Sequence, residues 1–266
     1  MQRSLRHRMI IRAVATGATV TVEGLCQLTG AAPITVRRDL AELAELGMVR
    51  RVRGGATRAE LRGSAMPFSV RFESDRARKD ALASAVVGLV EDGQSLVLDN
   101  GTTCYAVARQ LVGRPLTVLA LSLHAAAALA TRPGVRVVVP GGLVENDTLA
   151  FTGHDAVRAV QDTHADLAVL GACSAQPGFG LTSTTYEDAQ VKRACLAAAA
   201  QRVLVTTADK LARTSTFRFG TPADLTHLVT TDDVADDVVT AFEAEGVAVL
   251  AVAAPAAPDA PDAPGD

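Results

Sequence analysis

Residues 80–252 alternate between short runs of valine and leucine and longer alanine-rich stretches, and this alternation constrains the fold most strongly. Each run is nearly continuous in apolar residues and bounded by glycine, as is typical of strands buried on both faces of a parallel sheet. The stretches between the runs predict helices that cover the two faces. The sequence therefore predicts a mostly parallel α/β domain over residues 80–252. The predicted strands are SLVLD, LTVLAL, VRVVVP, ADLAVLG, RVLVTT, HLVTT and VAVLAV, and the helices include 103–112, 122–131, 153–161, 187–201 and 235–245.

Residues 1–58 follow a different pattern, that of three short helices and a hairpin. A first helical pattern over residues 4–16 precedes Thr21, a good N-cap for a second helix that Gly30 ends. Pro33 suits the first turn of a third helix, and the segment MVRRVRGGATR then predicts a hairpin. This is the layout of a winged helix-turn-helix. We expect a linker over residues 59–79 and, because it is low-complexity Pro/Ala/Asp, a disordered tail over 253–266.

The charges are divided unevenly between these two parts. Residues 1–64 hold 11 of the 26 basic residues and 5 of the 29 acidic ones, a net charge of +6. The remainder therefore holds 15 bases and 24 acids, a net charge of −9. Such asymmetry indicates a basic nucleic-acid module joined to an acidic body, although a solvated basic face would account for the charge alone.

The third predicted helix and the hairpin carry the residues expected to contact DNA. A recognition helix presents its N-terminal end to the major groove, where arginine reaches guanine edges or phosphates. Asp39 is expected to pair with a neighbouring arginine instead. The alternative is an arginine-coated helical bundle that binds no DNA. The predicted DNA-binding residues are Thr35, Arg37 and Arg38 on the helix and Arg50, Arg51, Arg53, Gly54 and Gly55 on the hairpin.

The segment Asp99-Asn100-Gly101-Thr102-Thr103 follows a predicted buried strand and opens a helix. Such a junction gathers backbone N–H groups and hydroxyls around an anion, but an ordinary tight turn is the alternative. Ligands of open α/β sheets lie beyond the carboxyl ends of the strands, so other loops there are candidates too. Lysine is rare in this chain, and a retained lysine can serve as a point charge for phosphate. The predicted effector-binding residues are Asp99, Gly101, Thr102, Thr103, Ser122, Gly141, Gly142, Gly180, Thr182, Glu187, Lys192 and Lys210.

The motif TVRRDL and the hairpin RVRGGA resemble the N-terminal signature of the DeoR family of transcriptional regulators, which has a TIRRDL-type helix and an RVHGGA-type wing. Asp99–Thr103 is similar to that family's D-x-G-T-T loop, and the segment from Glu187 to Lys192 is similar to its E-x-x-x-V-K motif. The resemblance implies a sensor domain related to sugar-phosphate isomerases and CoA-transferases. Two departures, Ala120-Leu121 and Ala208-Asp209-Lys210, predict an altered pocket beyond the phosphate.

Together these features predict a DNA-binding regulator, most simply a repressor of carbohydrate catabolism genes, that a phosphorylated sugar releases from operator DNA. The alternative is a sugar-phosphate isomerase-like enzyme with Glu187 or Asp99 as the base and Lys210 polarising the carbonyl. The sequence predicts no catalytic function, cofactor, metal or membrane partner. The scattered cysteines and the lack of an apolar leader indicate a cytoplasmic protein. Helix-turn-helix proteins usually bind paired half-sites, which favours a homo-oligomer, either a dimer or a tetramer.

Overall fold

The computed structural model describes residues 3–14, 19–45, 48–58, 68–73, 75–146 and 148–253. It divides into two compact units, Met1–Ser74 and Asp75–Asp266. Most of the predicted tail and the first half of the predicted linker lie outside the described residues. The rest of that linker contains helix α4 (Phe68–Glu73) and the start of α5. In α4 the rings of Phe68 and Phe72 stack one helical turn apart, a spacing that the prediction of a linker overlooked.

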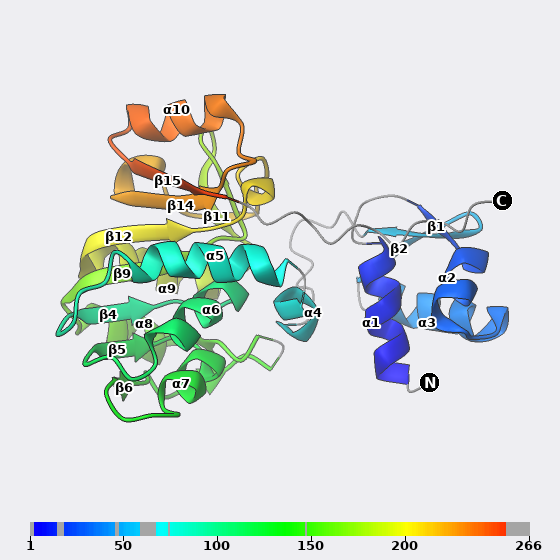
Figure 1. Cartoon of the computed structure of the whole chain (residues 1–266), viewed down its shortest axis with the longest axis horizontal. Helices are drawn as coiled ribbons and strands as arrows, with labels where there is room; N and C mark the ends of the chain where they lie inside the picture. Colours follow the sequence, from blue (N-terminus) through cyan, green and yellow to red (C-terminus); the bar gives the residue numbers. More distant parts are fainter. Residues whose placement is uncertain are drawn as a thin grey trace. The chain divides into compact units, whose positions relative to one another are not determined.

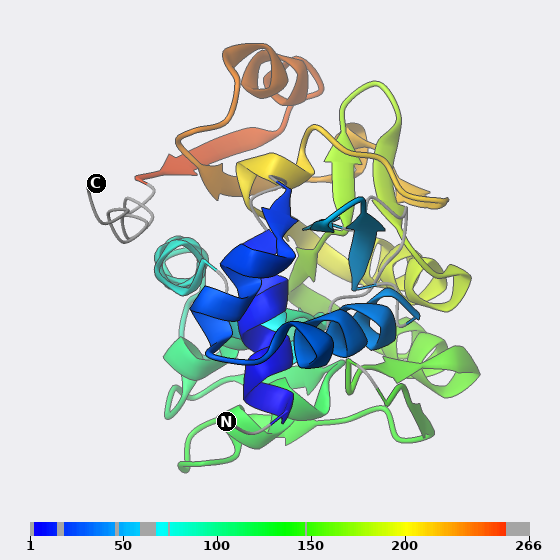
Figure 2. The same ribbon diagram turned by 90° about the vertical axis from the view of Figure 1, so that its right-hand side faces the viewer.

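The first unit is a winged helix-turn-helix (Figures 1 and 2). Thr21 caps the second helix by accepting a hydrogen bond from the Gly24 N–H, and Gly30 ends that helix in the left-handed conformation, as predicted. A short strand before this helix pairs with the hairpin, which the sequence did not predict. The core is aliphatic and includes Ile10, Leu25, Val36, Leu40 and Leu43. The elements are α1 (Arg3–Val14), β1 (Val20–Thr21), α2 (Val22–Thr29), α3 (Pro33–Glu45), β2 (Val49–Val52) and β3 (Gly55–Arg58), with strand order β1-β3-β2.

The second unit is built on a 7-stranded sheet in which every neighbouring pair is parallel. Each predicted strand is found, and the strand order is β15-β14-β12-β9-β4-β5-β6 (Figure 1). The chain builds the sheet outward from β4 in one direction and then from β9 in the other. The strands are β4 (Ser95–Leu98), β5 (Thr117–Ala120), β6 (Arg136–Val138), β9 (Ala165–Gly171), β12 (Ala199–Val205), β14 (His227–Thr231) and β15 (Ala248–Val252).

Helices cover both faces of this sheet. Alternate strand residues point to opposite faces, so Leu96 and Leu98 belong to one core cluster and Val97 to the other. The first cluster is completed by α5 (Arg76–Val87), α6 (Thr102–Leu111) and α7 (Leu123–Leu129). The second is completed by α8 (Gly153–Gln161), α9 (Tyr186–Ala198) and α10 (Asp236–Ala244). The predicted fold class, a winged helix-turn-helix with a mostly parallel α/β domain, is confirmed.

Smaller strands in the second unit were not predicted. An antiparallel sheet has the order β10-β11-β13, and a hairpin joins β7 and β8. The helix predicted to residue 201 ends at Ala198, because the alanine-rich segment after it pairs with β9 as the start of β12. None of the helices in the described part of the chain combines the length and apolar character of a membrane span. The remaining elements are β7 (Leu143–Val144), β8 (Phe151–Thr152), β10 (Ser174–Gln176), β11 (Gly180–Ser183), η1 (Ala208–Lys210), β13 (Phe217–Gly220) and η2 (Pro222–Asp224).

The close approach of β1 and β3 generates a stability prediction. A Cβ atom at Gly55 would lie 2.1 Å from the Val20 carbonyl oxygen, so Gly55→Ala must push the two strands apart. We expect this change to destabilise the first unit by more than about 1 kcal/mol in thermal unfolding. Gly178→Ala is the matched control, since a Cβ atom there meets no other heavy atom within 4 Å. Equal effects of the two substitutions would contradict the packing described for the wing.

Candidate DNA interface and effector site

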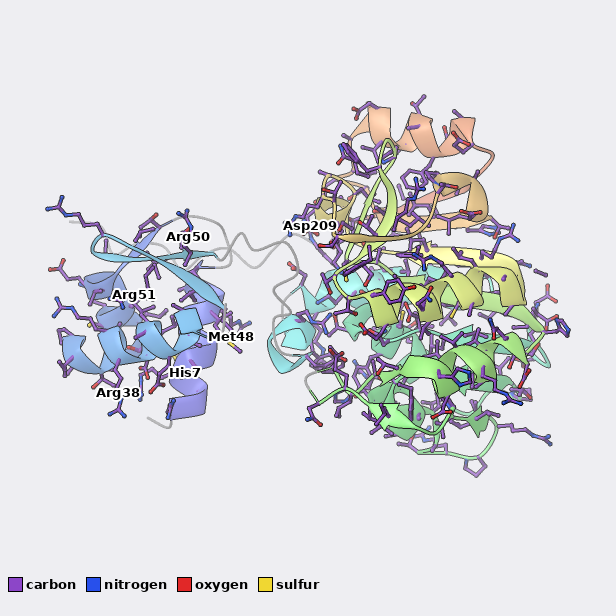
Figure 3. The ribbon with its side chains drawn as sticks, turned by 180° about the vertical axis from the view of Figure 1, so that it is seen from behind. His7, Arg38, Met48, Arg50, Arg51 and Asp209 are labelled. Atoms are coloured by element: carbon purple, nitrogen blue, oxygen red, sulfur yellow. The ribbon has the colours of Figure 1, made fainter. Side chains whose placement is uncertain are left out.

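The recognition helix α3 presents the predicted arginines to solvent. Arg37 and Arg38 are exposed near its N-terminal end, while Thr35 is half-buried. Figure 3 shows Arg38 projecting away from the helix, and 82% of its side chain is exposed. Its Nε lies 3.5 Å from Glu42 one turn later, a contact that solvent screens. The helix therefore offers two extended guanidinium groups on the side opposite its apolar stripe.

Asp39, the acidic residue of the same motif, is buried and anchors α3 to α1. Its carboxylate accepts hydrogen bonds from the Arg6 guanidinium and from Nε2 of His7, which lies 3.0 Å from Oδ1. Burial alone would raise the pKa of Asp39, but the bonds from Arg6 and His7 outweigh it, so the pKa lies below its ordinary value. The predicted intramolecular pairing of Asp39 is thus present, with a partner 33 residues away in sequence.

His7, Asp39 and Glu42 bring three potential ligand atoms within 4.8 Å of one another. Guanidinium groups already occupy both carboxylates, because Arg6 pairs with Asp39 and Arg3 pairs with Glu42. A divalent cation would have to displace these charges. We therefore interpret the group as an ion-pair network that holds the recognition helix.

The hairpin β2–β3 forms the wing. In β2 Val49 is buried in the core, whereas Arg50 and Arg51 are exposed. Figure 3 labels the two arginines on the hairpin. Arg53 is also exposed, at the turn. Gly54 takes a φ of 82°, which favours glycine, and its carbonyl accepts a hydrogen bond from the Val22 N–H. The wing thus carries exposed arginines on a short, tightly turned support.

In the second unit, the loops after β4 and β9 diverge from a topological switch point. These strands are neighbours in the sheet, but the chain continues from β4 towards β6 and from β9 towards β15. In open α/β sheets, ligands bind in the crevice that such a reversal opens at the carboxyl ends of the strands. Asp99 follows β4 directly, and its Oδ2 accepts a hydrogen bond of 2.9 Å from the Gly171 N–H at the end of β9.

A buried lysine completes this junction. Lys192 of α9 pairs with Asp99, and its Nζ lies 3.5 Å from Asp188 on the same helix. The side chains of Lys192 and Asp99 are 3% and 0% exposed. Burial alone would lower the pKa of Lys192, but the two carboxylates outweigh it and raise the pKa, so the lysine stays charged. Lys192 was predicted to bind an effector. The structure places it inside the protein as the counter-ion of Asp99, in the loop Asp99–Thr103 that is predicted to bind an effector and is called the effector loop below.

The loop leads into the N-terminus of α6, which has no side-chain cap. Gly101 precedes α6 with a φ of 105°, and its carbonyl accepts the Tyr105 N–H. Thr102 and Thr103 begin the helix and are only 5% and 6% exposed. Lys210, after β12, is half-buried and donates a hydrogen bond of 3.1 Å to the Ala172 carbonyl, one residue beyond Gly171. The strand ends of β4, β9 and β12 therefore bring the loop and Lys210 to one edge of the sheet.

The other predicted effector residues have local structural roles. Ser122 caps α7, accepting from the Ala125 N–H. Gly141 and Gly142 take φ values of 77° and 74°, and a Cβ at Gly142 would lie 2.4 Å from the Asp155 carboxylate. Gly180 and Thr182 lie on β11, away from the seven-stranded sheet. There Thr182 accepts from the Ser215 N–H at 2.9 Å.

The sequence predicted Glu187 as an effector-binding residue, whereas the adjacent Asp188 was not predicted. Glu187 is exposed on the first turn of α9, whereas Asp188 contacts Lys192, Asn100 and Ser183. The spacing of Asp188 and Lys192, four residues apart on a helix, was the available signal. Ala120 and Leu121 are both fully buried, and their effect on the pocket stays a prediction.

Comparisons with known proteins agree with this architecture. Residues 6–61 match the model of the DeoR-like helix-turn-helix domain, and residues 74–232 match that of the DeoR C terminal sensor domain. The glycerol-3-phosphate regulon repressor of Haemophilus influenzae is 32% identical over 90% of this chain and 93% of its own length. The L-fucose operon activator of Escherichia coli is 26% identical over 90% of this chain and its whole length. A ribose 5-phosphate isomerase structure from Methanocaldococcus jannaschii aligns with 52% of this chain and 56% of its own, at 20% identity and a TM-score of 0.38.

The buried ion pair predicts a non-additive mutant cycle. Lys192→Met leaves the Asp99 charge buried without its cation and should cost about 3–5 kcal/mol of unfolding free energy. Combining it with Asp99→Asn removes that charge and keeps an acceptor for the Gly171 N–H, so the double variant should recover much of the loss. Denaturant unfolding of the three variants measures the coupling.

The matched control is Arg158→Met on α8. Arg158 lies 3.7 Å from Asp162, but the two side chains are 72% and 73% exposed. We expect a change of no more than about 0.5 kcal/mol there. Strictly additive effects of Lys192→Met and Asp99→Asn would show that the two side chains are not energetically coupled.

Proposed function

This chain belongs to the DeoR family of transcriptional regulators, and from that premise we propose that it represses carbohydrate catabolism genes until a phosphorylated sugar or related intermediate binds its second unit. The observation that carries the proposal is the junction of β4 and β9, where Asp99, Gly171 and Lys192 fix an anion-binding loop at the switch point of the sheet. The relative from Haemophilus influenzae, a repressor of a glycerol-3-phosphate regulon, supports both the sign of regulation and a phosphorylated effector.

On the DNA side, α3 enters the major groove and the wing lies along the backbone. Arg37 and Arg38 are exposed at the end of α3 that reads bases in helix-turn-helix proteins. Arg50, Arg51 and Arg53 contact phosphates, which gives affinity with little sequence preference. Paired half-sites then require a homo-oligomer, a dimer or a tetramer, acting on DNA in the cytoplasm.

On the effector side, capture of an anion must rely on local donors, because the chain beyond residue 64 has a net charge of −9. Lys192 does not supply this charge, since Asp99 and Asp188 already neutralise it. The remaining donors are the first N–H groups of α6, the hydroxyls of Thr102 and Thr103, and Lys210. Together they bind the phosphate, while the sugar extends across the loops after β4 and β9.

The regulator binds this effector without turning it over. If the protein were an isomerase, Asp99 or Glu187 would be the base. Asp99, however, is fully buried, and Glu187 is exposed on α9. Asp99 is also bonded to Lys192 and to the Gly171 N–H. These contacts support a structural role for Asp99, and relatives that are transcriptional repressors support binding without turnover. Binding alone releases DNA if the effector prefers the arrangement that does not bind the operator, with a coupling of about 1–3 kcal/mol.

Two arginine substitutions separate base reading from phosphate contact. Arg37→Ala should weaken binding to the preferred duplex by about 1–3 kcal/mol and relax preference at one base position. Arg51→Ala should weaken binding to all duplexes alike and lower the salt slope by about one. Selection from random duplexes followed by salt-dependent titration measures both effects. Arg158→Ala on α8 is the control, and unchanged affinity in both test variants would exclude α3 and the wing as the interface.

The effector contacts generate a second test. Thr102→Ala combined with Lys210→Ala should abolish effector-induced release and leave operator affinity unchanged, because both residues lie outside the DNA-binding unit. Calorimetry with sugar phosphates and their unphosphorylated parents measures binding directly. Arg213→Gln is the control, since Arg213 lies near Lys210 in sequence and pairs with Asp209 at 2.9 Å. If the neutral sugars bind as tightly as the phosphates, the phosphate-binding role of the loop is wrong.

A further inference from the structure

A groove on the second unit shares no lining residue with the effector loop or with Lys210. It lies between α9 and β13 and has a volume of about 510 Å³. Tyr186 and Arg193 line it from α9, and Phe217, Arg218 and Phe219 line it from β13. Small-molecule sites commonly have volumes of about 300–1,000 Å³. We refer to this recess as the α9–β13 groove.

A second cavity, of about 320 Å³, adjoins this groove. Both are lined by Arg193, Phe219 and Asp224, so the two form one elongated recess along α9. Arg202 lines the second cavity, and its Nε is buried with no hydrogen-bond partner among the described residues.

The charges of the recess favour an anion. It is lined by three arginines, Arg193, Arg202 and Arg218, and by one residue with a carboxylate, Asp224. This carboxylate already accepts hydrogen bonds of 2.7 and 2.9 Å from the N–H and hydroxyl of Thr221. The recess is therefore locally basic although the unit as a whole has a negative net charge. Arginine guanidinium groups bind carboxylate and phosphate groups through two parallel hydrogen bonds.

Aromatic side chains form the rest of the recess. The Tyr186 and Phe217 rings meet edge to face, with centroids 5.8 Å apart, and Tyr186 is 50% exposed. The Arg193 guanidinium lies 6.0 Å from the centre of the Tyr186 ring. Its Nη1 donates to the Gln190 side chain and its Nη2 to the Arg218 carbonyl, and these two bonds fix its position. Phe219 is buried and contributes to both cavities. An exposed ring beside an ordered guanidinium is suited to stacking on a planar ligand.

We propose that the α9–β13 groove is a second ligand site, which binds an organic anion carrying an aromatic ring. The ring stacks on Tyr186 beside Phe217, and the anionic group pairs with Arg193, which lines both cavities. This site is independent of the proposed sugar-phosphate site, because no residue is common to the two.

Phenyl phosphate is the probe, and phenol and inorganic phosphate are its matched halves. Ligand-observed NMR and calorimetry on the full chain should show phenyl phosphate binding at least about tenfold more tightly than either half, because only it engages the rings and the arginines together. Arg193→Gln and the exposed-site change Arg218→Glu should each weaken binding by about tenfold or more. Arg158→Gln and Lys210→Ala should leave it unchanged.

Four results would overturn the proposal. Equal binding of inorganic phosphate and phenyl phosphate would remove the role of the rings, and unchanged binding in Arg218→Glu would remove the role of the groove. Loss of binding in Lys210→Ala would place the probe at the effector loop. If Arg218→Glu instead changes the oligomeric mass while phenyl phosphate does not bind, the groove is an interface between copies of the chain. Arg218 is exposed, so this variant tests the groove even if Arg193→Gln fails to fold.

Discussion

The buried pair of Lys192 and Asp99 is the interaction on which the geometry of the proposed effector site depends. Asp99 stands at the end of β4 and receives both the ammonium group from α9 and the Gly171 N–H from the end of β9. One carboxylate thus ties together the two strands between which the sheet reverses its direction of growth. A buried charge pair contributes little to net stability but makes each partner indispensable to the other. The pair instead serves to position the site, because it holds the loop before α6 in one conformation.

The DNA-binding unit uses the same device on a smaller scale. Asp39 lies in the middle of the recognition helix, and Arg6 and His7 from α1 satisfy its carboxylate. The two arginines before it can then project into solvent, since the acidic residue that would repel DNA phosphates is turned inward and neutralised. In both units a buried carboxylate positions neighbouring residues that are proposed to meet a ligand. Substitutions at such positions are expected to alter function by moving neighbours.

The strands of the main sheet could be predicted because a strand that is buried on both faces consists of consecutive apolar residues. The helix caps at Thr21 and Gly30 depend only on nearby residues, and both were predicted correctly. The antiparallel sheet was missed because β10, β11 and β13 are 3 or 4 residues long and mix polar with apolar side chains. At the site, the loop before α6 was visible from its composition. That Lys192 is buried, and that Asp188 rather than Glu187 meets it, depends on how α9 is rotated against the sheet.

The Gly171 amide reports most directly on the claim that Asp99 and Lys192 organise the effector site. Its N–H donates to the Asp99 carboxylate, so its hydrogen exchange measures how often that junction opens. We expect slow exchange of this amide in the wild-type chain, much faster exchange in Lys192→Met, and further slowing when a sugar phosphate is bound. Exchange at Gly171 that is as fast as in the exposed loops, and insensitive to Lys192→Met, would contradict that claim.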